Sequence, residues 1–412
     1  MRPLLHFTAE SGWINDPHGI TYIDGQYHAF FQYVPGKTVW APNCHWGHAV
    51  GADLLSLREL PVAIAPGEGD GGIWTGSLVR TDDGAARIFY TSTSEPNIGI
   101  GRIRVATPLD DDWIAWRKGD VVADAPDELD IIAYRDPFVR RDGDRWRMFV
   151  GAGLRDGTAT ALSYVSDDLE SWRYEGIALA RSTDETEPVW MGALWECPQI
   201  LEVDGRSVMV SSIWDDDVLH HAGYAIGDEE NGVFAAETWG RLTYGDSYYA
   251  PSLFFDADGR PCLLFWMRGI GGASDGWASA HSLPHVLSLR DGQVWTTPHE
   301  DLLGHRGPRS VDGTTPRPMA DIEWDAGGDG QLEITVGGVP AASLRIEGAE
   351  VAVTVGGVTT TVPAAGDLRI VIDGPVLEVS TGVALFGARL TVDDAQLTTN
   401  ATAGTLRVYP LA

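Results

Sequence analysis

Hydrophobic and polar residues up to about residue 298 alternate over short stretches, and helical periodicity is scarce. The apolar runs are bounded by Gly, Asp and Pro, as in residues 26–33 (QYHAFFQY) and 206–213 (RSVMVSSI). Short runs with a two-residue period that end at turn-forming residues are typical of β-strands. The pattern therefore predicts an all-β protein.

The pair Asp-Gly, a strong signal for a tight hairpin turn, recurs along this region. Five copies with matching apolar flanks start at residues 24, 83, 142, 204 and 258, at intervals of 59, 59, 62 and 54 residues. Further Asp-Gly pairs at 70, 156 and 291 fall outside this spacing. Five copies of a roughly 60-residue unit predict a five-bladed β-propeller with four strands per blade. A β-sandwich with irregular loops is the alternative.

The composition changes after the fifth copy. A stretch rich in Pro, Gly, Arg and Asp predicts a linker over residues 299–318. Strict alternation of Val, Thr and Leu follows, and Trp324 is the one tryptophan there. The pattern predicts a propeller domain at 1–298 and a small C-terminal β-sandwich at 319–412. We expect the chemistry in the propeller and a structural role for the sandwich.

Three carboxylates fall at matching positions of the repeat. Asp16, Asp136 and Glu196 precede the Asp-Gly turns of their copies by 8, 6 and 8 residues. Such positions lie at the start of the strand nearest the propeller axis, so the three acids are expected at one mouth of the central channel. Taken singly, Asp-Pro at positions 16 and 136 is typical of turns. The joint pattern favours a shared site.

Paired carboxylates in a funnel rich in tryptophan are the apparatus of glycoside hydrolysis. The chain has 16 tryptophans, which indicates either sugar-stacking platforms or a Trp-rich core. A Ca²⁺ site is the competing hypothesis, but the acids come from separate blades without a carbonyl-rich loop. His45 and His48 have near-ligand spacing but no evident third ligand. We therefore expect no metal and no cofactor.

The formal net charge of −30 is the strongest bulk signal. It argues against nucleic acid and anionic membrane surfaces as partners, since both require a positive face. It suits a neutral or cationic partner, such as a small carbohydrate substrate, and a homo-oligomer is left open. Three scattered cysteines and a start without an apolar signal region favour a cytoplasmic location. Secretion is the alternative if a signal peptide has been removed.

Six motifs together resemble glycoside hydrolase family 32, the invertases, inulinases, levanases and related fructosyltransferases. They are WINDPHG (13–19), FQYVP (31–35), WGHA (46–49), WTGS (74–77), YRDP (134–137) and WECPQ (195–199). Their order and spacing match over residues 1 to about 300. The resemblance implies a retaining β-fructofuranosidase acting on sucrose or short fructo-oligosaccharides.

The resemblance also implies residue roles. Asp16 is the expected nucleophile, Glu196 the general acid and base, and Asp136 the residue that stabilises the transition state. Arg135 is expected to neutralise part of the acid cluster and so keep Asp136 ionised. The residues expected to line the fructosyl subsite are Asn15, Gln32, Trp40, Trp74, Thr75, Arg135 and Trp266.

Four residues depart from the usual family pattern: His18, Val34, Ser247 and His285. They leave the expected fructosyl site intact and the choice of substrate open. Two alternatives therefore remain. One is a fructosyltransferase or an enzyme that forms or hydrolyses difructose anhydrides on the same scaffold. The other is a catalytically silent sugar-binding protein.

Overall fold

The computed structural model describes residues 1–412 and is built almost entirely of β-strands. Helical structure is limited to η1 (Ala273–Asp275) and α1 (Asp301–Gly304). Neither helix has the length or apolar character needed to cross a bilayer. The all-β prediction is confirmed.

The first four repeat units each form four antiparallel strands that pair in chain order, because each strand is joined to the next by a short turn. The first unit is β1 (Gly12–Ile23), β2 (Gln26–Val34), β3 (His45–Gly51) and β4 (Arg58–Ile64). The second is β5 (Gly72–Arg80), β6 (Ala86–Thr93), β7 (Arg102–Pro108) and β8 (Trp116–Ala123). The third is β9 (Ile131–Asp142), β10 (Arg145–Leu154), β11 (Thr158–Ser166) and β12 (Arg173–Ser182). The fourth is β13 (Leu194–Val203), β14 (Arg206–Asp215), β15 (Val218–Glu230) and β16 (Val233–Arg241).

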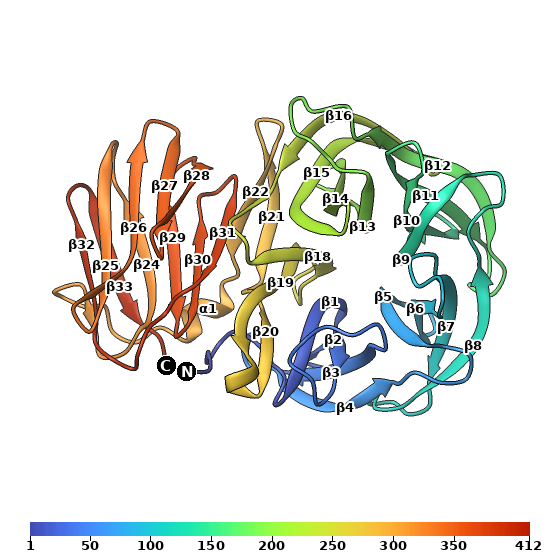
Figure 1. Cartoon of the computed structure of the whole chain (residues 1–412), viewed down its shortest axis with the longest axis horizontal. Coiled ribbons are helices and arrows are strands. Elements are labelled where there is room, and N and C mark those ends of the chain that lie inside the picture. The colour runs from blue at the N-terminus through green and yellow to red at the C-terminus, as the bar shows by residue number, and fades with distance from the viewer.

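The fifth unit closes the arrangement. It contains β18 (Tyr248–Phe255), β19 (Pro261–Gly272), β21 (His285–Arg290) and β22 (Gln293–Pro298). An extra strand, β20 (Trp277–His281), pairs antiparallel with β19 and parallel with β1. The first and last units therefore share one nine-stranded sheet. Figure 1 shows the units around a common centre, with the first strand of each unit innermost.

Each repeated Asp-Gly pair lies at the turn of the first hairpin of its unit. At Asp24-Gly25 and Asp204-Gly205 both residues have positive φ, between 49° and 82°. Such turns match the twist of the paired strands and favour Asp followed by Gly. The hairpin positions read from the repeat are thus present in the structure.

Tryptophans supply much of the packing. Trp46, Trp195 and Trp324 are fully buried, and each indole N–H donates to a backbone carbonyl at 2.9–3.0 Å. A buried tryptophan needs such a partner. These three tryptophans therefore belong to the hydrophobic core and do not form a stacking surface for sugars.

The C-terminal region forms two six-stranded sheets that enclose a cluster of 21 buried apolar residues. The first has the order β17 (Thr243–Tyr244), β31 (Leu385–Arg389), β30 (Val376–Ser380), β29 (Leu368–Asp373), β24 (Met319–Asp325) and β33 (Thr405–Pro410). The second has the order β23 (Thr314–Thr315), β32 (Leu397–Ala401), β25 (Gly330–Val336), β26 (Val339–Glu347), β27 (Glu350–Val355) and β28 (Val358–Pro363).

Two short strands link parts of the chain that the sequence pattern separates. β17 lies between the fourth and fifth units but pairs with β31 of the C-terminal region. The stretch predicted as a linker, residues 299–318, contains α1 and also β23, which pairs with β32. The C-terminal sheets are thus attached to the ring of units by backbone pairing as well as by the connecting chain.

Candidate active site

The innermost strand of every unit has a register irregularity near its start. The breaks lie at Asp16 in β1, Thr75 in β5 and Asp136 in β9, and directly after Glu196 in β13 and Tyr249 in β18. In four of these strands a proline follows within two residues. Proline cannot donate to the strand ladder, so it favours a bulge, and a bulge redirects the side chains beside it.

These bulges bring the three predicted acids together. The thiol sulfur of Cys197 lies 3.7 Å from an oxygen of Asp16 and 3.7 Å from an oxygen of Asp136. The backbone N–H of Cys197 donates to the same Asp136 oxygen at 3.0 Å. Cys197 has a φ of 50° and Asp136 a φ of 66°, conformations that non-glycine residues adopt rarely and that cluster at functional sites.

Asp16 accepts hydrogen bonds from three side chains. The donors are the amide of Asn15 (3.0 Å), the amide of Gln32 (3.1 Å) and the hydroxyl of Thr75 (2.6 Å). Burial raises the pKa of Asp16 and the charge of Glu196 adds to the rise, while the bonds from Thr75 and Asn15 oppose it. The carboxyl is thus held in one orientation by groups that favour its ionised form.

Glu196 accepts hydrogen bonds from one charged side chain and one neutral side chain. Nε and Nη2 of Arg135 donate to its Oε1 at 3.0 and 2.9 Å, and the hydroxyl of Tyr249 donates to its Oε2 at 2.6 Å. Arg135 was expected to keep Asp136 ionised, and its charge acts in that direction. Burial raises the pKa of Asp136 to about 7, with Glu196 and Asp16 adding to the rise and Arg135 opposing it. The guanidinium also pairs with Glu196, so its charge is shared between the two acids.

The other predicted subsite residues surround these groups. Trp74 is buried with its N–H on the Pro42 carbonyl (2.8 Å), and its ring lies 5.9 Å from the guanidinium carbon of Arg135. Trp40 packs edge-on to Trp74 and is 44% exposed, so it stands at the rim. Trp266 packs edge-on to Trp13 at 5.7 Å and to Tyr249 at 6.2 Å. The structure thus gathers every residue predicted for the site.

Two further residues belong to the site and were not predicted. Tyr249 donates to Glu196, and the guanidinium carbon of Arg268 lies 4.9 Å from the Tyr249 ring centre. Arg268 is anchored by a bond to the Leu219 carbonyl at 2.8 Å. Tyr249 lies 9 residues before the Asp-Gly turn of the fifth copy, close to the position that the acids hold in other copies, and this repeat position could have identified it. Arg268 had no such signal.

Cys197 does not supply a nucleophile. Burial, followed by the charges of Asp136 and Asp16, raises the pKa of its thiol well above the usual value. The thiol therefore stays protonated, and a thiol is a far weaker nucleophile than a thiolate.

The residues that depart from the family pattern lie in buried packing positions. His18 packs against Trp46 with 3.9 Å between the ring centres and 36° between the ring planes, and burial lowers its pKa well below the usual value. His285 and Ser247 are 1% and 4% exposed, near the C-terminal sheets. Val34 is 1% exposed in a small cluster with Trp74. None of the four contributes a hydrogen bond to the three acids.

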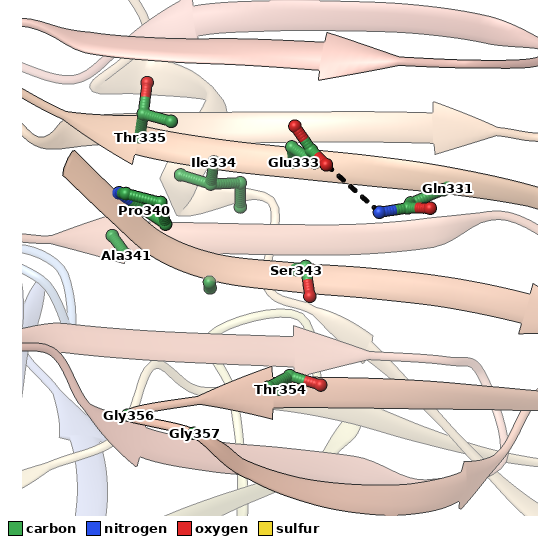
Figure 2. A pocket seen from close by; sticks show the side chains of 11 residues that line it. Gln331, Glu333, Ile334, Thr335, Pro340, Ala341, Ser343, Thr354, Gly356 and Gly357 are labelled. Carbon is green, nitrogen blue, oxygen red and sulfur yellow. Dashed lines mark hydrogen bonds between the residues drawn. The ribbon is translucent and has the colours of Figure 1, made fainter. Parts of the chain in front are cut away.

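Two other places in the molecule gather polar side chains. Asp256, Cys262 and His299 lie close enough together to hold a metal ion, but Nε of Arg260 donates to Asp256 at 2.7 Å and its Nη2 lies 3.3 Å from His299. A guanidinium there opposes a cation. A hollow in the second C-terminal sheet is lined by small and polar side chains, with Glu333 bonded to Gln331 at 3.2 Å (Figure 2).

Clustered carboxylates held by Arg and Tyr on the inner strands of an all-β ring are an arrangement typical of enzymes that act on glycosidic bonds. The family model for the "Glycosyl hydrolases family 32 N-terminal domain" matches residues 6–298. The chain therefore belongs to glycosyl hydrolase family 32.

Several relatives are similar over about three quarters of this chain. A sucrose-6-phosphate hydrolase of Zymomonas mobilis is 32% identical over 325 residues, which is 73% of this chain and 62% of the relative. A levanase of Bacillus subtilis is 34% identical over 343 residues, covering 74% of this chain and 48% of the levanase. The matched regions thus span less than two thirds of these relatives.

Solved structures show the same fold over the whole chain. The GH32 beta-fructofuranosidase of Bombyx mori has a TM-score of 0.86 at 24% identity, covering 100% of this chain and 94% of its own. The sucrose-6-phosphate hydrolase of Lactobacillus gasseri has a TM-score of 0.84 at 20% identity, covering 100% and 93%.

Proposed function

We propose that this protein is a retaining β-fructofuranosidase that releases terminal β-D-fructofuranosyl units from sucrose or short fructo-oligosaccharides. The observation that carries the proposal is the meeting of Asp16, Asp136 and Glu196, each with different hydrogen-bond partners. Members of the family that are similar to this chain are named as a sucrose-6-phosphate hydrolase, a raffinose invertase and a levanase. All three names fit a fructosyl substrate.

In the first step, the Asp16 carboxylate attacks the anomeric carbon of the fructosyl unit. Glu196 gives its proton to the departing glycosidic oxygen, and the C–O bond breaks. The donors Asn15, Gln32 and Thr75 hold the Asp16 carboxylate for this attack. Arg135 and Tyr249 hold both oxygens of Glu196, so its proton meets the leaving oxygen in a fixed direction.

In the second step, Glu196 takes a proton from water, and the water oxygen attacks the anomeric carbon. The bond to Asp16 breaks and fructose leaves with its original anomeric configuration. Asp136 contacts the fructose hydroxyls and stabilises the oxocarbenium-like transition state. A retaining mechanism requires the Asp16 and Glu196 carboxyls to lie about 5–5.5 Å apart.

We also infer the architecture that this function uses. The five units around a common centre are interpreted as a five-bladed β-propeller over residues 1–298, and the two C-terminal sheets as a β-sandwich over 319–412. Residues 299–318 connect them. The order of strands and the likeness of fold to family members support this division.

A release assay tests the proposal. Sucrose, kestose, inulin and levan are each incubated with the protein, and the sugars released are separated by chromatography. Fructose from sucrose and kestose, formed first as the β-anomer in a proton NMR time course, is the expected result. Trisaccharides or cyclic products from concentrated sucrose would instead indicate transfer, and inverted product would contradict the assigned nucleophile.

A further inference from the structure

The chain segment that leads into β18, the strand that carries Tyr249, pairs with a strand of the C-terminal sheets. Just before β18, residues 243 and 244 pair in parallel with Leu385 and Phe386 of β31. The N–H of Leu385 donates to the Leu242 carbonyl at 2.9 Å. The chain that leads into the active site is therefore an edge strand of a C-terminal sheet.

Tyr248 adds a side-chain contact to this attachment. Its ring packs edge-on to Phe265 at 5.0 Å, and it is 1% exposed. A Cβ placed on Gly387 of β31 would lie 2.8 Å from the Tyr248 ring, so only glycine lets the two strands approach this closely. The Tyr248 hydroxyl lies 3.4 Å from Nε2 of His285.

A buried carboxylate of the C-terminal region lies next to His285. Glu378 on β30 is 2% exposed, accepts the N–H of Leu283 at 3.0 Å and lies 3.7 Å from His285. Burial raises the pKa of Tyr248 well above the usual value, and the charge of Glu378 adds to the rise. Glu378, His285 and Tyr248 therefore form one buried polar group across the interface.

Successive residues of a strand face opposite ways. Tyr248 therefore points to the C-terminal sheets while Tyr249 points to the acids, where its hydroxyl donates to Glu196 at 2.6 Å. A shift of Tyr248 in its socket moves the backbone shared by both tyrosines. Displacements of about 1 Å at a catalytic group can cost roughly 100-fold in rate.

We propose that Glu378, acting through Tyr248, is a positioning residue for the general acid: the C-terminal sheets fix β18 so that Tyr249 holds Glu196 toward the leaving group. The inference rests on the role of Glu196 in the proposed function. It gives the C-terminal region a part in catalysis, although none of its residues touches the three acids. Protonation of the leaving group is then the step that depends on this region.

Two substrates separate this role from simple stability. Sucrose has a poor leaving group and needs the proton from Glu196, whereas the nitrophenolate of p-nitrophenyl β-D-fructofuranoside departs without one. The kcat/KM of Glu378→Gln is measured on both. We expect a loss of about tenfold or more on sucrose and less than about twofold on the aryl fructoside, because general acid catalysis contributes only where protonation is needed.

Asp321→Asn is the matched control. Asp321 is a buried carboxylate of the same C-terminal sheet, but its partners are the guanidinium groups of Arg306 and Arg369, and it does not contact β18. It should keep the parent's ratio of the two activities. Tyr248→Phe keeps the ring and removes the hydroxyl, and it serves as the test variant if Glu378→Gln does not fold. It should lower the activity on sucrose and leave the activity on the aryl fructoside unchanged.

The outcomes distinguish the two levels of the account. Equal losses on both substrates in folded Glu378→Gln and Tyr248→Phe, or unchanged activity on both, overturn the positioning role and leave the proposed function standing. A parent protein that hydrolyses neither substrate removes the proposed function and the inference with it.

Discussion

At the scale of single residues, the site depends on how the backbone aims side chains rather than on which residue types are present. Asp16 and Asp136 each precede a proline, as turn residues do, yet both lie at bulges that direct them toward Glu196. The repeat placed the three acids together from the sequence alone. It could not assign Arg135 to Glu196, because the partner of a long side chain depends on rotamers that no spacing encodes.

The nucleophile is the first residue to test. Asp16→Asn keeps the shape of the side chain and removes the charge that attacks the anomeric carbon, so kcat on sucrose should fall by several orders of magnitude. Glu196→Gln should do the same on sucrose, and Asp136→Asn should cost less. Steady-state kinetics on sucrose measure each effect.

Asp24→Asn is the control for Asp16→Asn. It makes the same change at the far end of the same strand, at an exposed turn with a φ of 52° that Asn tolerates. It should retain parental kcat. Full activity in Asp16→Asn would contradict the assignment.

Trp40 tests the rim of the site. It is 44% exposed and touches Trp74 edge-on, so Trp40→Ala should remove a stacking surface for the sugar and leave the three acids in place. We expect KM for sucrose to rise several-fold with little change in kcat or in melting temperature. An unchanged KM would show that Trp40 does not contact the substrate.

At the scale of elements, the Asp-Gly hairpins could be read from the sequence because turn and strand signals are local. The pairing of β20 with β1 and of β17 with β31 could not, since short strands that pair with distant partners carry no periodicity. The same limit hid α1 and β23 within the predicted linker. Local patterns predicted the hairpins, and tertiary contacts decided how the units are joined.

The packing within the first unit predicts acid sensitivity. His48 on β3 stacks on Phe30 at 4.2 Å and shares a hydrogen bond of 3.0 Å with His28. Burial lowers the pKa of His48 to about 3, with His28 adding to the fall. The unfolded chain therefore takes up this proton from about pH 6.5 downward while the folded chain does not, and the stability conferred by neutral His48 is lost progressively as pH falls toward 3.

Urea unfolding between pH 4 and pH 7 measures this effect. His48→Gln keeps a donor near the position of Nε2 and does not titrate, so its stability should fall less steeply with acid than that of the parent. The difference should approach roughly 1.4 kcal/mol per pH unit. Parallel slopes for the two proteins would contradict the prediction.

At the scale of the whole molecule, the ring and the C-terminal sheets are joined by a buried ionic network. His6 bonds to Asp373 at 2.9 Å and lies 3.4 Å from Glu378, which in turn faces His285 and Tyr248. Burial alone would lower the pKa of His6, but Glu378 and Asp373 raise it to about 9. Burial alone would raise the pKa of Glu378, but His6 and His285 lower it to about 2.

The network predicts a loss of stability in alkali. Because the pKa of His6 is raised in the folded state, its contribution is fully present below about pH 6.5 and is lost as pH rises through about 9. His6→Gln should therefore destabilise the protein strongly at pH 6 and much less at pH 9.5, as measured by thermal unfolding. A deficit of the same size at both values would show that the charge of His6 does not contribute.

The covalent intermediate is the most direct test of the account as a whole. Glu196→Gln is mixed with p-nitrophenyl β-D-fructofuranoside, which can transfer its fructosyl unit without an acid, and the protein is digested and analysed by mass spectrometry. Glu196→Gln cannot activate water, so the covalent intermediate should accumulate. The account predicts one anhydrofructose unit attached to the peptide that contains Asp16, and one equivalent of nitrophenol released as this adduct forms. An adduct on another residue, or a burst of nitrophenol with no adduct on Asp16, would contradict it.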